Sequence, residues 1–306
     1  MAPPLRIGTR GSKLALWQAN FVAAALGPLA APRPVERLTI ETTGDQVSDR
    51  PLGELGGIGV FTKEIQRALL AGAVDVAVHS LKDLPTIPVE GLVLAAVPAR
   101  AATGDVFISK KHQSFDALPA GAVVATGSLR RQAQILHRRP DLKLVGIRGN
   151  IDTRLRKLVE EDLDGLILAQ AGLERLGLAG AITEVLDPSW FLPAVGQGAL
   201  GLECRAEDAV TRELLTRLDD VATHQAVLAE RALLAGLGGG CLVPIGAIGK
   251  VEANVLNLRA AVLSPDGRQR VAGEIAGSAE QAEQLGRKLA DQLSAQGASE
   301  VLAEGR

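Results

Sequence analysis

The sequence predicts an α/β protein made of two similar α/β lobes and a third, smaller α+β domain. Short apolar segments alternate with Ala- and Leu-rich segments, a pattern typical of strands and helices around a parallel sheet. The segment VATGSLRRQAQIL, from Val124, repeats the pattern of IGTRGSKLALWQA, from Ile7, which favours two lobes of one kind. The alternation ends near His224, where a long helical segment precedes several strand-like segments.

The composition restricts the class of protein. A chain of 306 residues fits two or three domains, and 47% hydrophobic with 22% charged residues is typical of a soluble globular protein. The net charge of −2 and the 2% aromatic content, with no Tyr, argue against nucleic acid as a partner. We expect no leader, because a strand begins at Leu5, and no membrane span. Two cysteines provide no disulfide framework and indicate reduced thiols in the cytoplasm.

The first lobe is predicted from short apolar runs and from one helix start. Strands are expected at residues 5–9, 37–41 and 92–97, and helices at residues 13–26 and 61–71. Ser12 is a suitable N-cap for the first helix. Arg10 and Ser12 then lie where a strand ends beside a helix N-terminus, an arrangement that favours anions. Simple capping is the alternative, and it explains Ser12 better than Arg10.

The segment VDVAVHSLKDLP, from Val74, carries the strongest signal of a site. Its first half is short, β-branched and apolar, as expected of a strand buried on both faces. The strand then delivers Ser80, Lys82 and Asp83 to its carboxyl end, and Pro85 prevents a helix from following. Ligands bind at that edge of open α/β sheets. The alternative is a polar loop in which Asp83 caps a turn.

The second lobe places arginines at strand ends. Strands are expected at residues 122–126, 142–147 and 164–169, and helices at residues 129–138 and 151–160. Arg130, Arg131, Arg148 and Arg154 follow strands or begin helices, where a cation opposes the helix dipole. A bound polyanion would explain this cost, and arginine grips carboxylates with two parallel hydrogen bonds. Solvated surface charge is the alternative.

Two Pro- and Gly-containing segments, at residues 98–105 and 188–201, are predicted to cross between the lobes. A strand at residues 199–203 would return to the first lobe, and two crossings would form a hinged cleft like that of periplasmic binding proteins. The predicted domains are residues 1–99 with 200–217, residues 100–199, and residues 218–306.

The third domain is predicted to carry an accessible thiol. A helix at residues 224–237 is followed by Gly238–Gly240 and Cys241, then by strands at residues 245–249, 255–263 and 269–275 and a helix at residues 278–293. Three glycines form an uncrowded loop that can bring Cys241 into a cleft. A buried small residue in a turn is the alternative. Cys204, which ends an apolar strand, is expected to be inert.

Several motifs occur in a fixed order along the chain: IGTRGSKLAL from Ile7, FTKEIQRALL from Phe61, VHSLKDLP from Val78, TGSLRRQAQ from Thr126, RGNIDTRL from Arg148, VGQGALG from Val195 and GGCLVPIG from Gly239. Together these motifs resemble the porphobilinogen deaminase family. Several motifs in one order are far more specific than any single motif.

The resemblance implies a transferase of tetrapyrrole and haem biosynthesis that needs no metal. It would join four porphobilinogen molecules into hydroxymethylbilane, with loss of ammonia, on a covalent dipyrromethane cofactor held by Cys241. Each pyrrole carries an acetate and a propionate, so the growing product is a polyanion that requires many cationic donors. Loss of ammonia leaves a positive charge that one carboxylate can stabilise.

The resemblance also assigns roles to residues. Asp83 is the implied catalytic carboxylate. The implied cofactor-binding residues are Cys241, Lys82, Ser128, Arg130 and Arg131. The implied substrate-binding residues are Arg10, Ser12, Gln18, Ser80, Thr126, Arg148, Asn150, Arg154, Arg175 and Gln197. One departure is the glycine loop, which has Ile58, with Glu54 nearby, where the family commonly carries lysine. A lid contact to the substrate is therefore in doubt, and the crossing at residues 101–104 also lacks charged residues.

Two other functions compete with the enzyme. A non-catalytic two-lobed anion-binding module explains the lobes and the arginines but not a thiol on a glycine loop. A nucleic-acid binder is opposed by the charge and by the few aromatic residues. We expect a cytoplasmic monomer that acts on a small molecule, with no nucleic acid or membrane partner.

Overall fold

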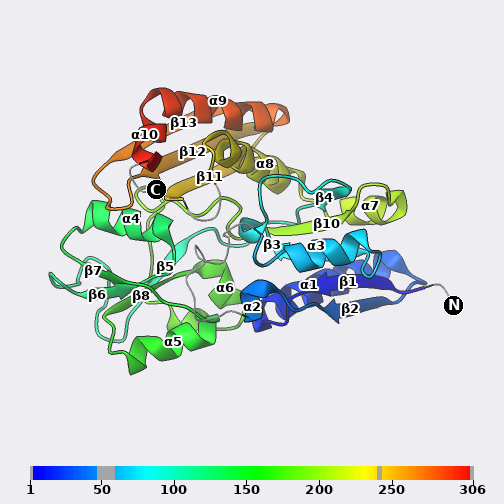
Figure 1. The fold of residues 1–306 in the computed structure, drawn as a ribbon, viewed down its shortest axis with the longest axis horizontal. Helices are drawn as coiled ribbons and strands as arrows, with labels where there is room; N and C mark the ends of the chain where they lie inside the picture. The colour runs from blue at the N-terminus through cyan, green and yellow to red at the C-terminus, as the bar shows by residue number, and fades with distance from the viewer. Residues whose placement is uncertain (1–2, 47–58, 240–242, 304–306) are drawn as a thin grey trace. The chain divides into compact units, whose positions relative to one another are not determined.

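The computed structural model describes residues 3–46, 59–239 and 243–303. The chain forms two compact units (Figure 1). Unit 1 contains Met1–Ala101 and Ala199–His224, and unit 2 contains Ala102–Gly198 and Gln225–Arg306. The division into three domains stays a prediction.

Within the described residues, unit 1 holds a five-stranded sheet. Its strands are β1 (Leu5–Thr9), β2 (Val35–Thr39), β3 (Val76–Ser80), β4 (Leu92–Ala96) and β10 (Leu200–Arg205), in the order β2-β1-β3-β10-β4. β1 runs parallel to β2 and β3, whereas β10 is antiparallel to both β3 and β4. The returning strand is therefore confirmed, but the sheet is mixed rather than parallel, because the chain re-enters it in the opposite direction.

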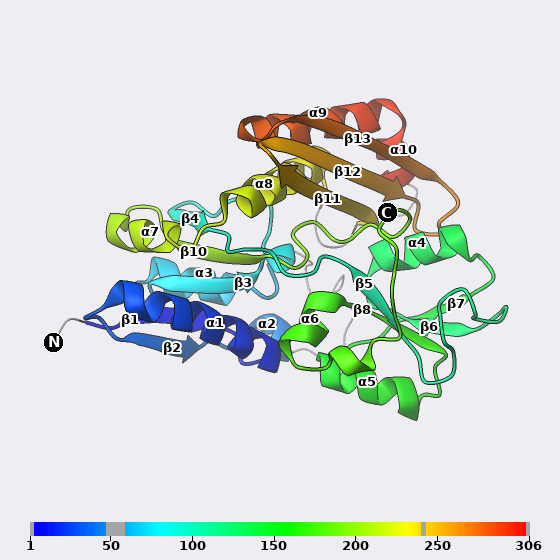
Figure 2. The same cartoon turned by 180° about the vertical axis from the view of Figure 1, so that it is seen from behind.

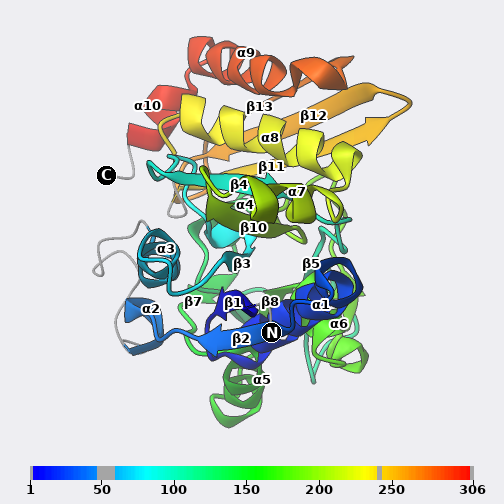
Figure 3. The same cartoon turned by 90° about the vertical axis from the view of Figure 1, so that its right-hand side faces the viewer.

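Helices cover both faces of this sheet. They are α1 (Lys13–Ala30), α2 (Thr43–Gln46), α3 (Lys63–Leu70) and α7 (Ala209–Thr216). α1 packs with Ile7 and Val76, whereas α3 packs with Val74 and Ala77, so α1 and α3 lie on opposite faces (Figure 3). The predicted end of α1 at residue 26 was wrong. The helix continues past Pro28 because Leu26 and Ala30 extend its buried face.

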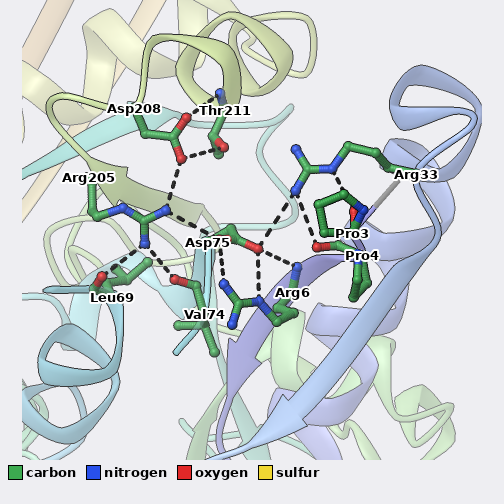
Figure 4. A network of polar contacts seen from close by, with 10 residues as sticks. All are labelled: Pro3, Pro4, Arg6, Arg33, Leu69, Val74, Asp75, Arg205, Asp208 and Thr211. Carbon is green, nitrogen blue, oxygen red and sulfur yellow. Dashed lines mark hydrogen bonds and ion pairs between the residues drawn. The ribbon is translucent and has the colours of Figure 1, made fainter. Parts of the chain in front are cut away.

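A network of charged side chains ties together the amino end of β3 (Figure 4). The Asp75 carboxylate accepts hydrogen bonds from the backbone N–H and the guanidinium of Arg6, at 2.9–3.2 Å, and one from Arg205 at 3.2 Å. Arg205 also binds the Asp208 carboxylate at 3.0 Å and donates to the carbonyls of Leu69 and Val74. These contacts join β1, β3, β10 and α7 through side chains.

The described part of unit 2 contains a second five-stranded sheet with the same arrangement. Its strands are β5 (Asp105–Ile108), β6 (Val123–Ala125), β7 (Lys143–Val145), β8 (Gly165–Ala169) and β9 (Glu184–Val185), in the order β7-β6-β8-β5-β9. β6 is parallel to β7 and β8, and β5 is antiparallel to β8 and β9. The predicted similarity of the two lobes is confirmed, because in each sheet a strand next to a crossing runs against its neighbours.

The helices of this lobe agree closely with the sequence. α4 (Leu129–Arg138) and α5 (Ile151–Glu160) have the predicted bounds, and α6 (Gln170–Arg175) follows β8. Phe107 and Val106 are both fully buried but belong to different apolar clusters, so both faces of the sheet are covered. The strands β5 and β9 were not predicted.

A three-stranded antiparallel sheet makes up the rest of the described part of unit 2 (Figure 2). The sheet consists of β11 (Ile245–Glu252), β12 (Val255–Leu263) and β13 (Arg270–Ser278). Its apolar core includes residues of α8 (Val221–Gly236), which begins in unit 1, α9 (Ala282–Ala295) and α10 (Ala298–Ala303). The three predicted strands and the α+β character are confirmed. The helix predicted at residues 278–293 is α9, which begins later, at Ala282, because β13 extends to Ser278.

Candidate active site

A short turn at the carboxyl end of β3 presents Lys82 and Asp83. Every residue of β3 is buried except the last, Ser80, and a 3-10 turn follows at Leu81–Asp83. The turn is fixed because buried Leu81 donates its N–H to the carbonyl of Ala199 at 3.0 Å, just ahead of β10. Lys82 and Asp83 are half-buried on this turn. The structure therefore places both residues at the sheet edge that the sequence indicated.

Buried polar side chains make contacts at the last two residues of β3, directly before this turn. His79 Nε2 lies 2.9 Å from Glu203 Oε2, and the Gln66 amide donates to both oxygens of Glu203. Beside them, the Gln18 amide donates to Ser80 Oγ at 2.8 Å and links α1 to β3. The sequence analysis missed Glu203, although a carboxylate inside the apolar strand LGLECR was a visible signal.

Arg10 and Ser12 lie near the carboxyl end of β1. Ser12 caps α1, because its Oγ accepts a hydrogen bond from Ala15 N. The Arg10 guanidinium binds Asp45 through two of its nitrogens and lies over the Phe61 ring, 4.1 Å from the centroid. Burial raises the pKa of Asp45, but hydrogen bonds from Arg10 and Thr42 outweigh this and keep the pKa below its ordinary value. Arg10 is thus a cation already held by a carboxylate.

In unit 2, Thr126 and Ser128 form the turn between β6 and α4. Thr126 is fully buried, and its hydroxyl oxygen accepts from Ser128 N at 3.3 Å. Ser128 is the N-cap of α4, where its Oγ accepts from Arg131 N. A Cβ on Gly127 would lie 2.8 Å from the carbonyl oxygen of Ile147, so the close approach requires glycine there.

Arg130 and Arg131 are buried, not displayed on the surface. Both side chains turn to the Asp105 carboxylate, with Arg130 Nη2 2.8 Å from Oδ2 and Arg131 Nη2 2.7 Å from Oδ1. Gln197, also buried, donates to Asp105 Oδ1 at 3.0 Å. Asp105 was not predicted as part of a site, because it ends the predicted crossing at residues 98–105 and its partners are distant in the chain.

The other candidate binders of unit 2 lie around two backbone turns. Arg148 is half-buried and Asn150 exposed at the turn before α5, and Arg154 donates to the Gly149 carbonyl at 2.7 Å. Arg175, at the end of α6, donates to the Gly198 carbonyl at 2.8 Å. Burial lowers the pKa of Arg175, against the attraction of Glu174.

Of the two cysteines, the structure describes Cys204. Cys241, like Glu54 and Ile58, lies outside the described residues. Cys204 is fully buried, and burial raises its thiol pKa to about 11. Since the thiolate is the nucleophile, Cys204 is unreactive at neutral pH, as the sequence predicted.

The described part of the chain contains no apolar helix of the length that a membrane span requires. Across residues 3–46, 59–239 and 243–303, no group of three His, Cys, Asp or Glu side chains could hold a metal ion.

Comparison with solved structures gives distant matches to binding proteins. The Methionine Binding Protein MetQ is 16% identical with a TM-score of 0.45, over 81% of this chain and 98% of that protein. A periplasmic substrate-binding protein of an ABC transporter from Coxiella burnetii is 15% identical with a TM-score of 0.44, over 74% of this chain and 96% of that protein.

Comparison with curated proteins gives matches along nearly the whole chain. Porphobilinogen deaminase of Pelobacter propionicus is 49% identical over 99% of this chain and 98% of its own length. Those of Trichlorobacter lovleyi and Geobacter sulfurreducens are each 50% identical, covering 99% and 98% of this chain and 97% and 94% of their own lengths. The family model for the porphobilinogen deaminase dipyromethane cofactor binding domain matches residues 5–213, and the C-terminal domain model matches residues 224–295. The chain therefore belongs to the porphobilinogen deaminase family.

Proposed function

We propose that this protein joins four porphobilinogen molecules into the linear tetrapyrrole hydroxymethylbilane, with release of ammonia, as a transferase of tetrapyrrole biosynthesis. The observation that carries the proposal is the fixed turn with Lys82 and Asp83 at the carboxyl end of β3, in a chain that matches the family from Leu5 to Ala295 apart from a short gap. Each condensation breaks the C–N bond of one aminomethyl group and forms a C–C bond to the preceding pyrrole, which loses a proton.

Asp83 has the chemistry that this reaction requires. Positive charge grows on the pyrrole nitrogen as ammonia leaves, and a carboxylate stabilises that charge more than it stabilises the neutral ring. The turn that carries Asp83 is pinned to Ala199, so its orientation is set before the substrate arrives. The same carboxylate can accept the proton that the attacking pyrrole loses.

The cationic residues suit a ligand that carries two carboxylates on every pyrrole. Arginine and lysine donate charge-assisted hydrogen bonds to such groups, and hydroxyl and amide groups complete the set. The proposed binders are Arg10, Ser12, Gln18, Ser80, Lys82, Thr126, Ser128, Arg130, Arg131, Arg148, Asn150, Arg154, Arg175 and Gln197. Several have protein partners here, so a ligand carboxylate must share or replace those partners.

The dipyrromethane cofactor fits this donor set. Arg130 and Arg131 are buried with Asp105 as their shared carboxylate, which leaves one positive charge in excess for a ligand carboxylate. When bound, the cofactor supplies the pyrrole to which the first substrate molecule is joined. We propose Cys241 as its point of attachment, because Cys241 follows three glycines in the sequence, whereas Cys204 is buried and unreactive.

Product analysis with intact mass tests the function. The purified protein should carry a two-pyrrole adduct and convert porphobilinogen to hydroxymethylbilane, with four ammonia molecules released per bilane. A non-catalytic anion-binding module would bind porphobilinogen without releasing ammonia and would show an unmodified mass. Either result would contradict the proposed enzyme activity.

We also propose a cytoplasmic monomer with three domains. Each sheet is covered by helices of its own unit, and β11–β13 share an apolar core with α8 and α9, which supports a separate domain at residues 218–306. Light scattering on the eluted protein should give the mass of one chain, about 32 kDa. A dimer mass would contradict the monomer.

A further inference from the structure

The Asp105 carboxylate lies between two guanidinium groups in the interior of unit 2. Arg130 Nη2 lies 2.8 Å from Oδ2, and Arg131 donates to Oδ1 from Nε at 3.0 Å and from Nη2 at 2.7 Å. Asp105 is the first residue of β5, whereas both arginines belong to the first turn of α4. One carboxylate therefore binds both cations, which also donate to the carbonyls of Leu192 and Ile167.

The position of Asp105 in the sheet is the position of a ligand site. β5 runs against β8, and Asp105 pairs with Ala169, the last residue of β8. The amino end of β5 thus lies at the carboxyl end of the parallel strands, where ligands bind in α/β sheets. Asp105 and its arginines occupy the edge of this sheet that corresponds to the edge carrying Asp83 in unit 1.

The cluster of Asp105, Arg130 and Arg131 is buried and carries a net positive charge. The side chains of Asp105, Arg130 and Arg131 are 0%, 4% and 7% exposed, so water screens them little. Burial lowers the pKa of Arg130, and Arg131 lowers it further, while Asp105 opposes both effects. Two cations and one carboxylate leave one excess positive charge, which suits an incoming ligand carboxylate. Arg130 Nε is buried and has no hydrogen-bond partner among the described residues.

Asp105 is itself held by Gln197, and the residue before Gln197 is bound to Glu230. Gln197 Nε2 donates to Asp105 Oδ1 at 3.0 Å and to the carbonyls of Thr103 and Gly104. The preceding residue, Gly196, donates its N–H at 2.7 Å to Glu230, a fully buried carboxylate of α8. The other oxygen of Glu230 accepts from Gly249 of β11 at 2.7 Å. These contacts form a hydrogen-bond chain that connects the arginines to α8, the helix that ends at Gly236, shortly before Cys241.

We propose that Asp105 is a positioning residue, which holds Arg130 and Arg131 charged and correctly oriented to bind ligand carboxylates and is itself fixed through Gln197 and Glu230. The proposal rests on the proposed function, because the ligand is taken to be the dipyrromethane cofactor or the growing tetrapyrrole. Asp105 does not touch the reacting atoms. Replacing Asp105 should therefore reduce cofactor assembly and ligand binding more than it reduces the stability of the fold.

The first test compares Asp105→Asn and Asp105→Glu with a control that removes the carboxylate partner of another arginine of α4. The control is Asp116→Asn, which removes the exposed partner of Arg138 in α4. Asp105→Asn should lower the fraction of chains with the two-pyrrole adduct, measured by intact mass, at least tenfold. Asp105→Glu should recover part of it, and the control should equal the wild type. A folded Asp105→Asn protein with full adduct and unchanged kcat/KM would overturn the proposal, as would equal losses in the Asp105→Asn and control variants.

A spectroscopic test remains valid if Asp105→Asn does not fold. In ¹⁵N-arginine-labelled wild type, the Nε–Hε groups of Arg130 and Arg131 should exchange slowly with water, assigned with Arg130→Lys and Arg131→Lys. Gln197→Ala should shift the Arg131 signal, because it releases one partner of Asp105 Oδ1, and should leave the Arg138 signal in place. A fast-exchanging Arg131 signal that Gln197→Ala does not move would refute the hydrogen-bond chain. This readout does not require hydroxymethylbilane formation, so it separates failure of this proposal from failure of the proposed function.

Discussion

Strand β3 has carboxylates near both of its ends, and their surroundings differ. Asp75, at the amino end, is 8% exposed and already bound by Arg6 and Arg205, with Arg33 at 3.9 Å (Figure 4). Asp83, beyond the carboxyl end, is half-buried on a short turn that the Leu81 N–H ties to the chain just ahead of β10. Asp75 and Asp83 are the same residue type, so their different surroundings follow from their positions at opposite ends of the strand.

The same distinction applies to the two clusters of arginines. The arginines around Asp75 are 18–33% exposed, so water shares in their solvation. Those around Asp105 are 7% exposed or less and lie at the ligand edge of their sheet. A hydrated cluster at the amino end of the strands stabilises the fold, whereas a dry cluster with excess charge at the carboxyl end is suited to bind an anion. The following predictions test this distinction.

The largest expected effect separates the two cysteines. Cys204 lies on β10 near the amino end of β3, where Glu203 pairs with Ala77, and its buried thiol is unreactive. Cys241→Ala should yield folded protein with no cofactor and no turnover. A pyrrole-reactive aldehyde stain should colour the wild type and Cys204→Ala, but not Cys241→Ala. Colour in the Cys241 variant would show that another group carries the cofactor.

The next largest effect concerns the carboxyl end of β3. Asp83→Asn keeps the shape of the side chain but removes its charge, so the rate of ammonia release should fall by about two to four orders of magnitude. Its thermal unfolding should stay near that of the wild type. The measurement is single-turnover ammonia release from protein that carries the cofactor, with Asp83→Glu expected to retain some activity. Near-normal release by the Asn variant would remove Asp83 from the mechanism.

Single changes of arginine to leucine should have intermediate effects that differ among positions. Each lost charge-assisted contact should cost about 1.5–3 kcal/mol, or roughly ten- to a hundredfold in kcat/KM. Arg131→Leu should impair cofactor assembly, and Arg148→Leu should stall elongation at one stage, visible by intact mass during turnover. Arg139→Leu, just after α4, which removes a pair with Asp141 and a hydrogen bond to the Leu118 carbonyl, is the control and should stay within twofold. Identical mild losses at all three positions would indicate a solvated surface.

Much of this arrangement could be predicted from the sequence because it depends on neighbours in the chain. The starts of α4 and α5 follow from the turns that end at Ser128 and Asn150, the N-cap residues of the two helices. The carboxyl end of β3 followed from an apolar run that stops at polar residues and proline. These local signals do not depend on the rest of the fold.

What the sequence could not show depends on distant pairing. β5 has four residues after a glycine-containing crossing, and its strand character arises from pairing with β8, some sixty residues later. Asp105, the shared partner of Arg130 and Arg131, could not be predicted for the same reason. The two arginines were therefore expected to bind only a ligand. Glu230 was missed because its burial and its partners appear only in the folded chain. For Glu203 the apolar strand around it was visible in the sequence, but its partner Gln66 was not.

At the amino end of β3, Asp75→Asn should change stability and leave catalysis unchanged. The variant loses charged hydrogen bonds from Arg6 and Arg205, so the free energy of unfolding should fall by about 2–3 kcal/mol. Urea unfolding measures this loss, and the exposed Asp266→Asn serves as the control, with an effect within about 0.5 kcal/mol. The rate of ammonia release by the folded Asp75→Asn protein should match that of the wild type. A large loss of rate would mean that the amino end also takes part in catalysis.

The smallest effect is a pH dependence that belongs to Asp75. Burial raises its pKa, but hydrogen bonds from Arg6 and Arg205 outweigh burial and hold the pKa below the ordinary 3.8. A carboxyl whose pKa is lower in the folded than in the unfolded chain stabilises the fold above the unfolded pKa, and this stabilisation is lost as pH falls through the folded value. The urea midpoints of wild type and Asp75→Asn should therefore differ most at pH 6–7 and converge as pH is lowered below about 4. Since Arg6, Arg33 and Arg205 remain charged over this range, the convergence reports the carboxyl alone. A difference that stays constant down to the acid limit would mean that the loss arises from packing rather than charge, and the hydrated cluster would then not be electrostatic in origin.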